Sequence, residues 1–276
     1  MRILCLGASF TGRYLARNFP EHRVEFLSRD PAAVRAEGLS AFVPGQASQD
    51  GTFDLILDCL PALPDAHGQR PAPHPYTEIV GSLLAAAPGR VIHVSSTSVY
   101  PAGADALVDV DDAPRYDETV PPAPPEERGQ ARLRLEEQLK AAWPGLLIIR
   151  ASGIYGPTRC LALGFQNGDF RRARSAGNKL VSRIHVHDLC RLALALAMTA
   201  DPPAIVNAVD RRPTANREVF SYLEERLEIT LPGEEWRTGA PSGRAIASRH
   251  TESLLGGTYR FPTYREGFEH ALESAR

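Results

Sequence analysis

The sequence feature that most constrains the fold is a turn with two glycines close to the start of the chain. Residues 2–6 form a short apolar run typical of a buried strand, and residues 10–18 carry helical spacing. In a strand–turn–helix unit the first glycine allows the tight turn, the last lets the helix pack closely on the strand, and N–H groups at the helix start face a phosphate. We therefore predict that the pyrophosphate of a dinucleotide is bound by Gly7, Ser9, Phe10, Thr11 and Gly12.

Ser9 stands where the pattern Gly-x-Gly-x-x-Gly has its middle glycine. A glycine string alone is weak evidence, whereas the strand before it and the helix after it make the assignment stronger. The alternative is a turn that merely ends a strand.

The chain continues with apolar runs that alternate with helical patterns, which is typical of a parallel sheet covered by helices on both faces. Strands are predicted at residues 2–6, 23–27, 39–43, 54–57, 90–94 and 146–150, and helices at 10–18, 76–87 and 126–142. The acidic, proline-rich stretch 101–125 is predicted to be a loop.

The pattern loosens after Arg150, where strands are predicted at 184–186 and 204–208 and helices at 188–198 and 216–227. The predicted fold class is therefore α/β, with a Rossmann-type doubly wound parallel sheet in residues 1–155. Residues 156–276 are predicted to form a smaller, mixed substrate-binding region, from which strand 184–186 and helix 188–198 pack back on the first domain.

Charge and composition exclude several classes of partner. The net charge is −2, so no global field favours nucleic acid or an anionic membrane. No apolar run approaches the ~18 residues of a membrane span, and residues 3–6 are too few for a signal-peptide core. We expect a cytoplasmic protein. The four scattered cysteines indicate small buried side chains in a reducing compartment, and no metal site is predicted.

The end of the second strand bears on the choice between NAD and NADP. An acidic residue there accepts hydrogen bonds from the ribose 2′-OH, whereas a basic residue pairs with a 2′-phosphate. Here Ser28 takes the acidic position and Arg29 offers a donor fork, while Asp30 before Pro31 suits a helix N-cap. NADP(H) is the predicted cofactor, with NAD as the alternative if Arg29 is only a surface residue.

Three later segments carry a resemblance to a known family. They are Val94-Ser95-Ser96-Thr97-Ser98-Val99-Tyr100, Arg150-Ala151-Ser152-Gly153-Ile154-Tyr155-Gly156-Pro157 and Arg183-Ile184-His185-Val186-His187-Asp188. With the glycine turn, they make the chain similar to the extended or atypical short-chain dehydrogenases/reductases of the NAD(P)-dependent epimerase/dehydratase type. The similarity runs from residue 1 to about residue 190 and continues more loosely to residues 262–267.

This resemblance implies roles for individual residues. Ser96, four residues before Tyr100, matches the position that contacts a substrate hydroxyl or carbonyl, and Thr97 is its neighbour. The cofactor-binding set that it implies adds Cys59, Leu60, Ser95, Ala151, Ser152, Gly153 and Ile154. The family's usual helix-mediated dimer, here through helices 76–87 and 126–142, makes a homodimer an expectation by analogy.

The chain departs from the family at the acid/base pair. Members carry Tyr-x-x-x-Lys at the start of the helix after the acidic loop, and this chain has no such string anywhere. Matching Glu136 to the family's later Glu puts Arg128 at the Tyr and Arg132 at the Lys. Arginine stays protonated, so neither residue accepts a proton, although both can polarise a carbonyl or clamp an anion. The alternative is that both are solvated helix residues.

Other side chains are also candidates for a chemical role. Tyr100, Tyr116, Asp117 and Tyr155 are candidates for acid/base work, with packing or loop roles as the alternative. His93 lies within a predicted strand and is interpreted as a satisfied core residue. The group His185, His187 and Asp188 is interpreted as structural or as bordering the substrate, with a metal pair as the alternative. The cluster Arg171, Arg172 and Arg174 is interpreted as a solvated helix face, with contact to an anionic substrate as the alternative.

Two functions are left open. The first is an NADP(H)-dependent oxidoreductase or epimerase/dehydratase-like enzyme that acts on a small polar, sugar-derived substrate, with Ser96, Thr97, Arg128 and Arg132 as catalytic residues. The second is a non-catalytic NADP(H)-binding protein that senses redox state.

Overall fold

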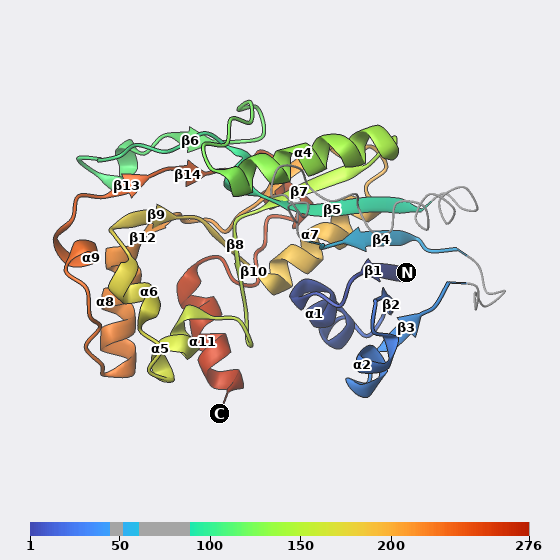
Figure 1. The fold of residues 1–276 in the computed structure, drawn as a ribbon, viewed down its shortest axis with the longest axis horizontal. Helices are drawn as coiled ribbons and strands as arrows, with labels where there is room; N and C mark the ends of the chain where they lie inside the picture. Colours follow the sequence, from blue (N-terminus) through green and yellow to red (C-terminus); the bar gives the residue numbers. More distant parts are fainter. Residues whose placement is uncertain (45–51, 61–88, 276) are drawn as a thin grey trace. The chain divides into compact units, whose positions relative to one another are not determined.

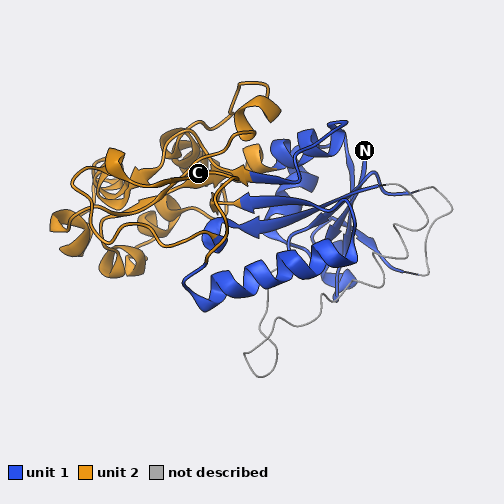
Figure 2. Cartoon of the chain, turned by 90° about the horizontal axis from the view of Figure 1, so that it is seen from above, with its two compact units in different colours: residues 1–99, 124–150, 190–206 blue, residues 100–123, 151–189, 207–276 orange. Residues whose placement is uncertain are grey.

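The computed structural model describes residues 1–44, 52–60 and 89–275. The chain forms two compact units that are interleaved along the sequence (Figure 2). The first contains Met1–Val99, Pro124–Arg150 and Cys190–Val206, and the second contains Tyr100–Ala123, Ala151–Leu189 and Asn207–Arg276. The predicted division into two consecutive domains at residue 155 stays a prediction.

A seven-stranded sheet runs through the first unit in the order β11-β7-β5-β4-β1-β2-β3. Figure 1 shows the run from β7 to β3. The pairs β3–β2, β2–β1, β1–β4 and β4–β5 are all parallel. The chain order reverses between β1 and β4, and doubly wound sheets bind ligands at the carboxyl ends of the strands beside such a reversal. The strands are β1 (Arg2–Leu6), β2 (Arg23–Leu27), β3 (Ser40–Phe42), β4 (Leu55–Asp58), β5 (Arg90–Ser96), β7 (Leu147–Ala151) and β11 (Ile205–Ala208). The predicted fold class is confirmed.

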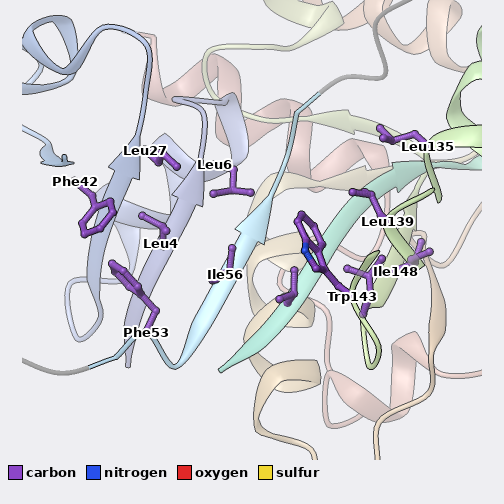
Figure 3. Packing of buried hydrophobic residues seen from close by; sticks show 12 residues of the cluster. Leu4, Leu6, Leu27, Phe42, Phe53, Ile56, Leu135, Leu139, Trp143 and Ile148 are labelled. Carbon is purple, nitrogen blue, oxygen red and sulfur yellow. The ribbon is translucent and has the colours of Figure 1, made fainter. Parts of the chain in front are cut away.

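Alternation along the strands gives the sheet two apolar faces. Leu4, Leu6 and Ile56 belong to one buried cluster with Leu139 and Trp143 of the α4 segment (Figure 3). On the opposite side, α1 approaches β1 and β2 so closely that a Cβ at Gly12 would lie 2.9 Å from Phe26 and 3.2 Å from the Cys5 sulfur. The helices of this unit are α1 (Phe10–Asn18), α2 (Pro31–Ala36), α4 (Glu127–Ala142) and most of α7 (Val186–Met198), with a 3₁₀ turn at Thr97–Val99.

The second unit has its own core, in which Phe165, Phe220, Trp236 and Phe268 are almost fully buried. Its helices are α5 (Leu161–Gln166), α6 (Arg171–Ser175), α8 (Asn216–Leu227), α9 (Glu235–Thr238), α10 (Thr251–Leu254) and α11 (Tyr264–Ser274), with a 3₁₀ turn at Val110–Asp112. Its strands are β6 (Arg115–Tyr116), β8 (Gly153–Tyr155), β9 (Lys179–Val181), β10 (Arg183–His185), β12 (Thr214–Ala215), β13 (Ser242–Gly243) and β14 (Ala245–Ile246). Among the described residues, no helix is long and apolar enough to span a bilayer.

The structure corrects some sequence-based boundaries. The stretch 101–125 was predicted to be a loop, but it contains β6, which pairs in parallel with β14. A two-residue strand has no pattern of its own, and its partner lies far away in the sequence. β10 ends at His185 and α7 begins at Val186, two residues before the predicted start. The helix predicted over residues 76–87 lies outside the described residues.

A buried ion pair holds α4 on the sheet. Glu136 of α4 and Arg150 of β7 are 1% and 2% exposed, and the Arg150 Nη2 to Glu136 Oε2 distance is 2.8 Å. Arg150 Nε also donates to the same carboxylate at 3.2 Å. Such a pair does not by itself stabilise a protein, but losing one partner leaves a charge buried alone.

We expect Glu136→Gln to lower the free energy of unfolding by about 3–5 kcal/mol, because the Arg150 charge then lacks its counter-ion. Urea denaturation followed by circular dichroism measures this change. Asp169→Asn, which removes an ion pair with the exposed Arg171, is the control and is expected to leave stability unchanged. Equal effects of the two substitutions would contradict the assignment.

Candidate functional site

The glycine turn has the geometry of a phosphate-binding loop. Gly7 has a φ of +77°, a conformation that side-chain-bearing residues rarely adopt, and a Cβ there would lie 2.6 Å from Leu60 Cδ2. Ser9 caps α1, since its Oγ accepts a hydrogen bond from Gly12 N at 3.0 Å. The positive end of α1 therefore opens on a turn without side chains at its two critical positions.

These residues fit a dinucleotide pyrophosphate. Gly7 has a positive φ that disfavours a side chain, and a Cβ at Gly12 would lie 2.9 Å from the Phe26 ring. The strand–turn–helix unit lies beside the sheet's reversal at β1 and β4. Ser9, which stands in place of the middle glycine, caps α1 with its hydroxyl.

The residues that follow β2 include the predicted cap of the next helix, α2. Asp30 Oδ1 accepts from Ala33 N at 2.9 Å and caps α2, as predicted. Ser28 Oγ accepts from Asp30 N at 3.2 Å. Arg29 is exposed and forms no ion pair with any described residue. Its guanidinium is therefore open to an anionic ligand.

The end of β5 and the start of α4 meet at one edge of the first unit. Gly129 lies so close to the Ser98 carbonyl that a Cβ there would be 2.4 Å from the oxygen. Ser96 is half-buried, and its Oγ accepts from Ser98 N at 3.2 Å. Thr97 opens the 3₁₀ turn, and Ser95 is buried with no described partner for its hydroxyl. Ser96 and the first turn of α4, with Arg128, thus belong to one neighbourhood.

The two arginines of α4 differ in their surroundings. Arg128 is exposed, whereas Arg132 is half-buried. Burial and, second, the positive charge of Arg128 lower the pKa of Arg132, while Asp58 and Glu136 oppose the shift. Two like charges near each other attract an anion or a polarised carbonyl oxygen.

A buried Asp–His pair lies beneath this edge, and sequence reasoning missed it. Asp58 ends β4 directly opposite His93 of β5, and both side chains are 0% exposed. The distance from Asp58 Oδ2 to His93 Nδ1 is 2.7 Å. His93 was interpreted as a satisfied core residue, but its Nε2 has no partner among the described residues. The available signal was an aspartate at the end of an apolar strand.

The thiols of the first unit are neutral. Burial raises the pKa of Cys59 to about 12, although a hydrogen bond with the Ser9 side chain opposes the shift. Burial also raises the pKa of Cys5 and Cys190. Cys59 and Leu60 follow β4, and Leu60 Cδ2 lies 2.6 Å from the place where Gly7 would have a Cβ.

The second unit contains a cationic pocket of about 850 Å³. Its lining includes the predicted Gly153 and Ile154 and four cationic residues, Arg159, Arg172, Lys179 and Arg183. Arg183 is 8% exposed and donates from Nη1 to Val181 O at 3.2 Å. No described carboxylate forms an ion pair with it, and burial lowers its pKa. The guanidinium therefore has unused donors beside the pocket.

Asp210 is buried in the same unit. Burial raises its pKa to about 8, and the nearby Arg183 opposes the shift. One carboxyl oxygen accepts from Arg212 N at 3.2 Å. Near neutral pH Asp210 is therefore mainly protonated and leaves the Arg183 charge available.

The remaining candidates for acid/base work have structural hydrogen bonds. Tyr100 donates to Asn207 Oδ1 at 2.8 Å, Tyr116 to Ala102 O at 2.9 Å and Tyr155 to Thr263 O at 3.1 Å. Asp117 accepts from Thr119 N at 2.8 Å. Burial also raises the pKa of Tyr155 well above its ordinary value.

Residues 185–188 and the end of β7 also form hydrogen bonds within the fold. Asp188 accepts the amides of Arg260 and Phe261 at 2.9 and 2.8 Å, and His185 Nδ1 accepts from His187 N at 3.1 Å. In the described part of the chain, no cluster of three metal-ligating side chains occurs. Ala151 and Ser152 are buried, and Ser152 N donates to Ala208 O at 3.0 Å.

This chain is similar to several proteins whose structures have been solved. No family model and no curated protein matches it. A conserved protein of unknown function from Silicibacter pomeroyi is similar at 27% identity and a TM-score of 0.74, over 100% of this chain and 99% of that chain. A putative NAD-dependent epimerase/dehydratase from Methylobacillus flagellatus is similar at 25% identity and a TM-score of 0.69, over 100% of this chain and 98% of that chain. The fold is also shared by the UDP-glucuronic acid 4-epimerase from Bacillus cereus, which was solved in complex with NAD. The identity is 15% and the TM-score is 0.71, over 99% of this chain and 96% of that chain.

The pKa of Asp210, about 8, predicts a pH dependence of stability. Because the folded pKa lies above the unfolded value, the native state binds the extra proton, and stability falls as the pH rises from the unfolded pKa to the folded one. Relative to Asp210→Asn, the wild-type free energy of unfolding should fall between pH 4 and pH 8 by at most about 1.4 kcal/mol per pH unit. Urea titrations at several pH values measure this difference, and a constant difference would contradict it.

Proposed function

We propose that this chain, which shares the fold of a putative NAD-dependent epimerase/dehydratase, binds NADP(H) in its first unit and acts on a small polar, sugar-derived substrate. The activity we propose is that of an oxidoreductase or an epimerase/dehydratase-like enzyme. The observation that carries this proposal is the turn from Gly7 to Gly12. Gly7 has a φ of +77°, a Cβ at Gly12 would meet Phe26 and Cys5, and Ser9 caps α1.

The choice of NADP(H) rests on the end of β2. Ser28 offers no carboxylate to a ribose 2′-OH, and the exposed Arg29 is free to pair with a 2′-phosphate. The Bacillus cereus epimerase was solved with NAD, so the class of cofactor agrees with that relative and the phosphate preference is a proposal for this chain.

When bound, the nicotinamide supplies a hydride acceptor or donor. Ser96 and Thr97 would orient the reacting oxygen at the end of β5. Arg128 and Arg132 would polarise that oxygen and stabilise negative charge on it, but neither accepts a proton, because arginine stays protonated. The chain thus has electrostatic groups at the positions where relatives carry Tyr and Lys.

The pocket of the second unit is a proposed binding place for an anion. Arg183 is buried with unused donors, and Arg159, Arg172 and Lys179 add positive charge along the lining. A planar guanidinium of this kind binds a carboxylate or a phosphoryl group through paired hydrogen bonds.

A second function rests on the missing acid/base pair. With no Tyr-x-x-x-Lys in the sequence and the candidate tyrosines engaged in structural hydrogen bonds, a non-catalytic NADP(H)-binding sensor is the alternative. The homodimer and the cytoplasmic location stay predictions.

Replacing Arg29 by Ala should weaken NADP⁺ binding by roughly tenfold or more, because it removes a charged hydrogen-bond partner of the 2′-phosphate. NAD⁺ binding should stay the same. Calorimetric titration of the cofactor-free protein measures both affinities. Arg35→Ala, which removes the same charge from the exposed side of α2, is the matched control. Equal losses for the two dinucleotides would contradict the 2′-phosphate assignment.

Ser96→Ala should lower turnover at least ~10²-fold for any hydroxyl or carbonyl compound that the wild type converts with NADP(H). Ser98→Ala in the adjoining turn is the control and should change the rate little. An unchanged rate for Ser96→Ala would remove Ser96 from the mechanism. If the wild type distinguishes NADP⁺ from NADPH in affinity but turns over nothing in a broad panel, the sensor function is favoured instead.

A further inference from the structure

Residues 58–60, at the end of β4, connect the buried, hydrogen-bonded Asp58–His93 pair to the glycine turn. All three residues belong to the first unit, as do their partners. At one end of the segment, Asp58 faces His93 across neighbouring strands. At the other end, Cys59 and Leu60 lie next to the turn that we propose as the phosphate-binding loop.

The contacts of Asp58 hold the segment firmly. The Asp58 carboxylate is fully buried, with one oxygen 2.7 Å from His93 Nδ1 and the other 3.0 Å from Leu60 N. A buried carboxylate is costly unless it keeps its hydrogen-bond partners, so the backbone at Leu60 is tied to the position of the pair. The guanidinium of Arg132 acts on the same carboxylate through its charge.

The contacts of Leu60 and Cys59 reach the loop at two points. Leu60 Cδ2 lies 2.6 Å from the place where Gly7 would have a Cβ, so this side chain covers the glycine with positive φ. The Cys59 thiol lies close enough to Ser9, which caps α1, for the Ser9 side chain to oppose the rise that burial causes in the Cys59 pKa. A shift of residues 58–60 would therefore move both contacts.

We propose that Asp58 and His93 are positioning residues for the phosphate-binding loop. The pair fixes Leu60 and Cys59 against Gly7 and Ser9 and in this way sets the affinity for a dinucleotide. This inference rests on the proposed cofactor-binding function, but its effect on the loop is measurable without a cofactor.

The same sheet offers a matched control. Arg2 and Glu25 form another shielded pair, with side chains 12% and 9% exposed and a distance of 2.8 Å. Arg2 begins β1, and its partner lies at the middle of β2, away from the carboxyl ends of the strands. Breaking this pair disturbs the sheet without touching residues 58–60, so it separates a loss of stability from a loss of loop geometry.

The test compares Asp58→Ala, Asp58→Asn and Glu25→Ala with the wild type. Amide hydrogen exchange of residues 7–12 and 58–60 is measured in the cofactor-free protein, and calorimetry gives the affinity for NADP⁺. We expect Asp58→Ala to accelerate exchange in both segments and to weaken binding by about 2- to 30-fold, the range for mutations that act through a packed network. Asp58→Asn keeps an acceptor for Leu60 N and should restore most of the affinity. Glu25→Ala should leave exchange in residues 7–12 and the affinity unchanged.

The outcomes separate this inference from the proposed function. If the wild type binds no dinucleotide, the proposed function fails, and the exchange data alone decide on the positioning role. If Asp58→Ala and Glu25→Ala behave alike in both measurements, the positioning role is overturned. Should Asp58→Ala not fold, Leu60→Ala keeps the hydrogen bond between Asp58 and His93 but removes the contact with Gly7. Unchanged exchange of residues 7–12 in that variant would overturn the proposal as well.

Discussion

The close contact of α1 with the sheet at Gly12 is the constraint on which the candidate site depends. Phe26 and Cys5 leave no room for a side chain at this position, so the helix lies directly on β1 and β2. This contact aims the positive end of α1 at the turn after β1, where Gly7 takes a conformation with positive φ. The loop geometry therefore follows from packing beneath the helix, and the contacts from Leu60 and Cys59 complete it from the other side.

The face of the sheet under α4 combines apolar packing with buried charges. Leu135, Leu139 and Trp143 complete the core there, and the nearby Glu136–Arg150 and Asp58–His93 pairs are almost fully buried. Each of these buried polar side chains has a partner within its pair, as burial requires. Arg132 stands among them with a lowered pKa. Because arginine stays protonated, Arg128 and Arg132 can act at this edge only through their positive charge.

Prediction from the sequence succeeded where the signal is local. The first strand, the first helix and α8 were predicted with the bounds that the structure has, and the Asp30 cap on α2 was identified from its position before a proline. It failed where the partner lies far along the chain. β6 exists because β14 supplies its hydrogen bonds, and His93 became a candidate functional residue only when its neighbour in the sheet was known to be Asp58.

The sequence by itself determined the strand–turn–helix unit, the arginine at the end of the second strand and the absence of a Tyr-x-x-x-Lys pair, since these depend on residue type at fixed spacing. Only the tertiary structure decided which side chains share a neighbourhood. It placed Leu60 on Gly7, paired Asp58 with His93 and buried Arg183 beside a pocket without an ion-pair partner among the described residues. The physical reason is that burial and pairing across strands are properties of the folded sheet and cannot be computed from spacing along one strand.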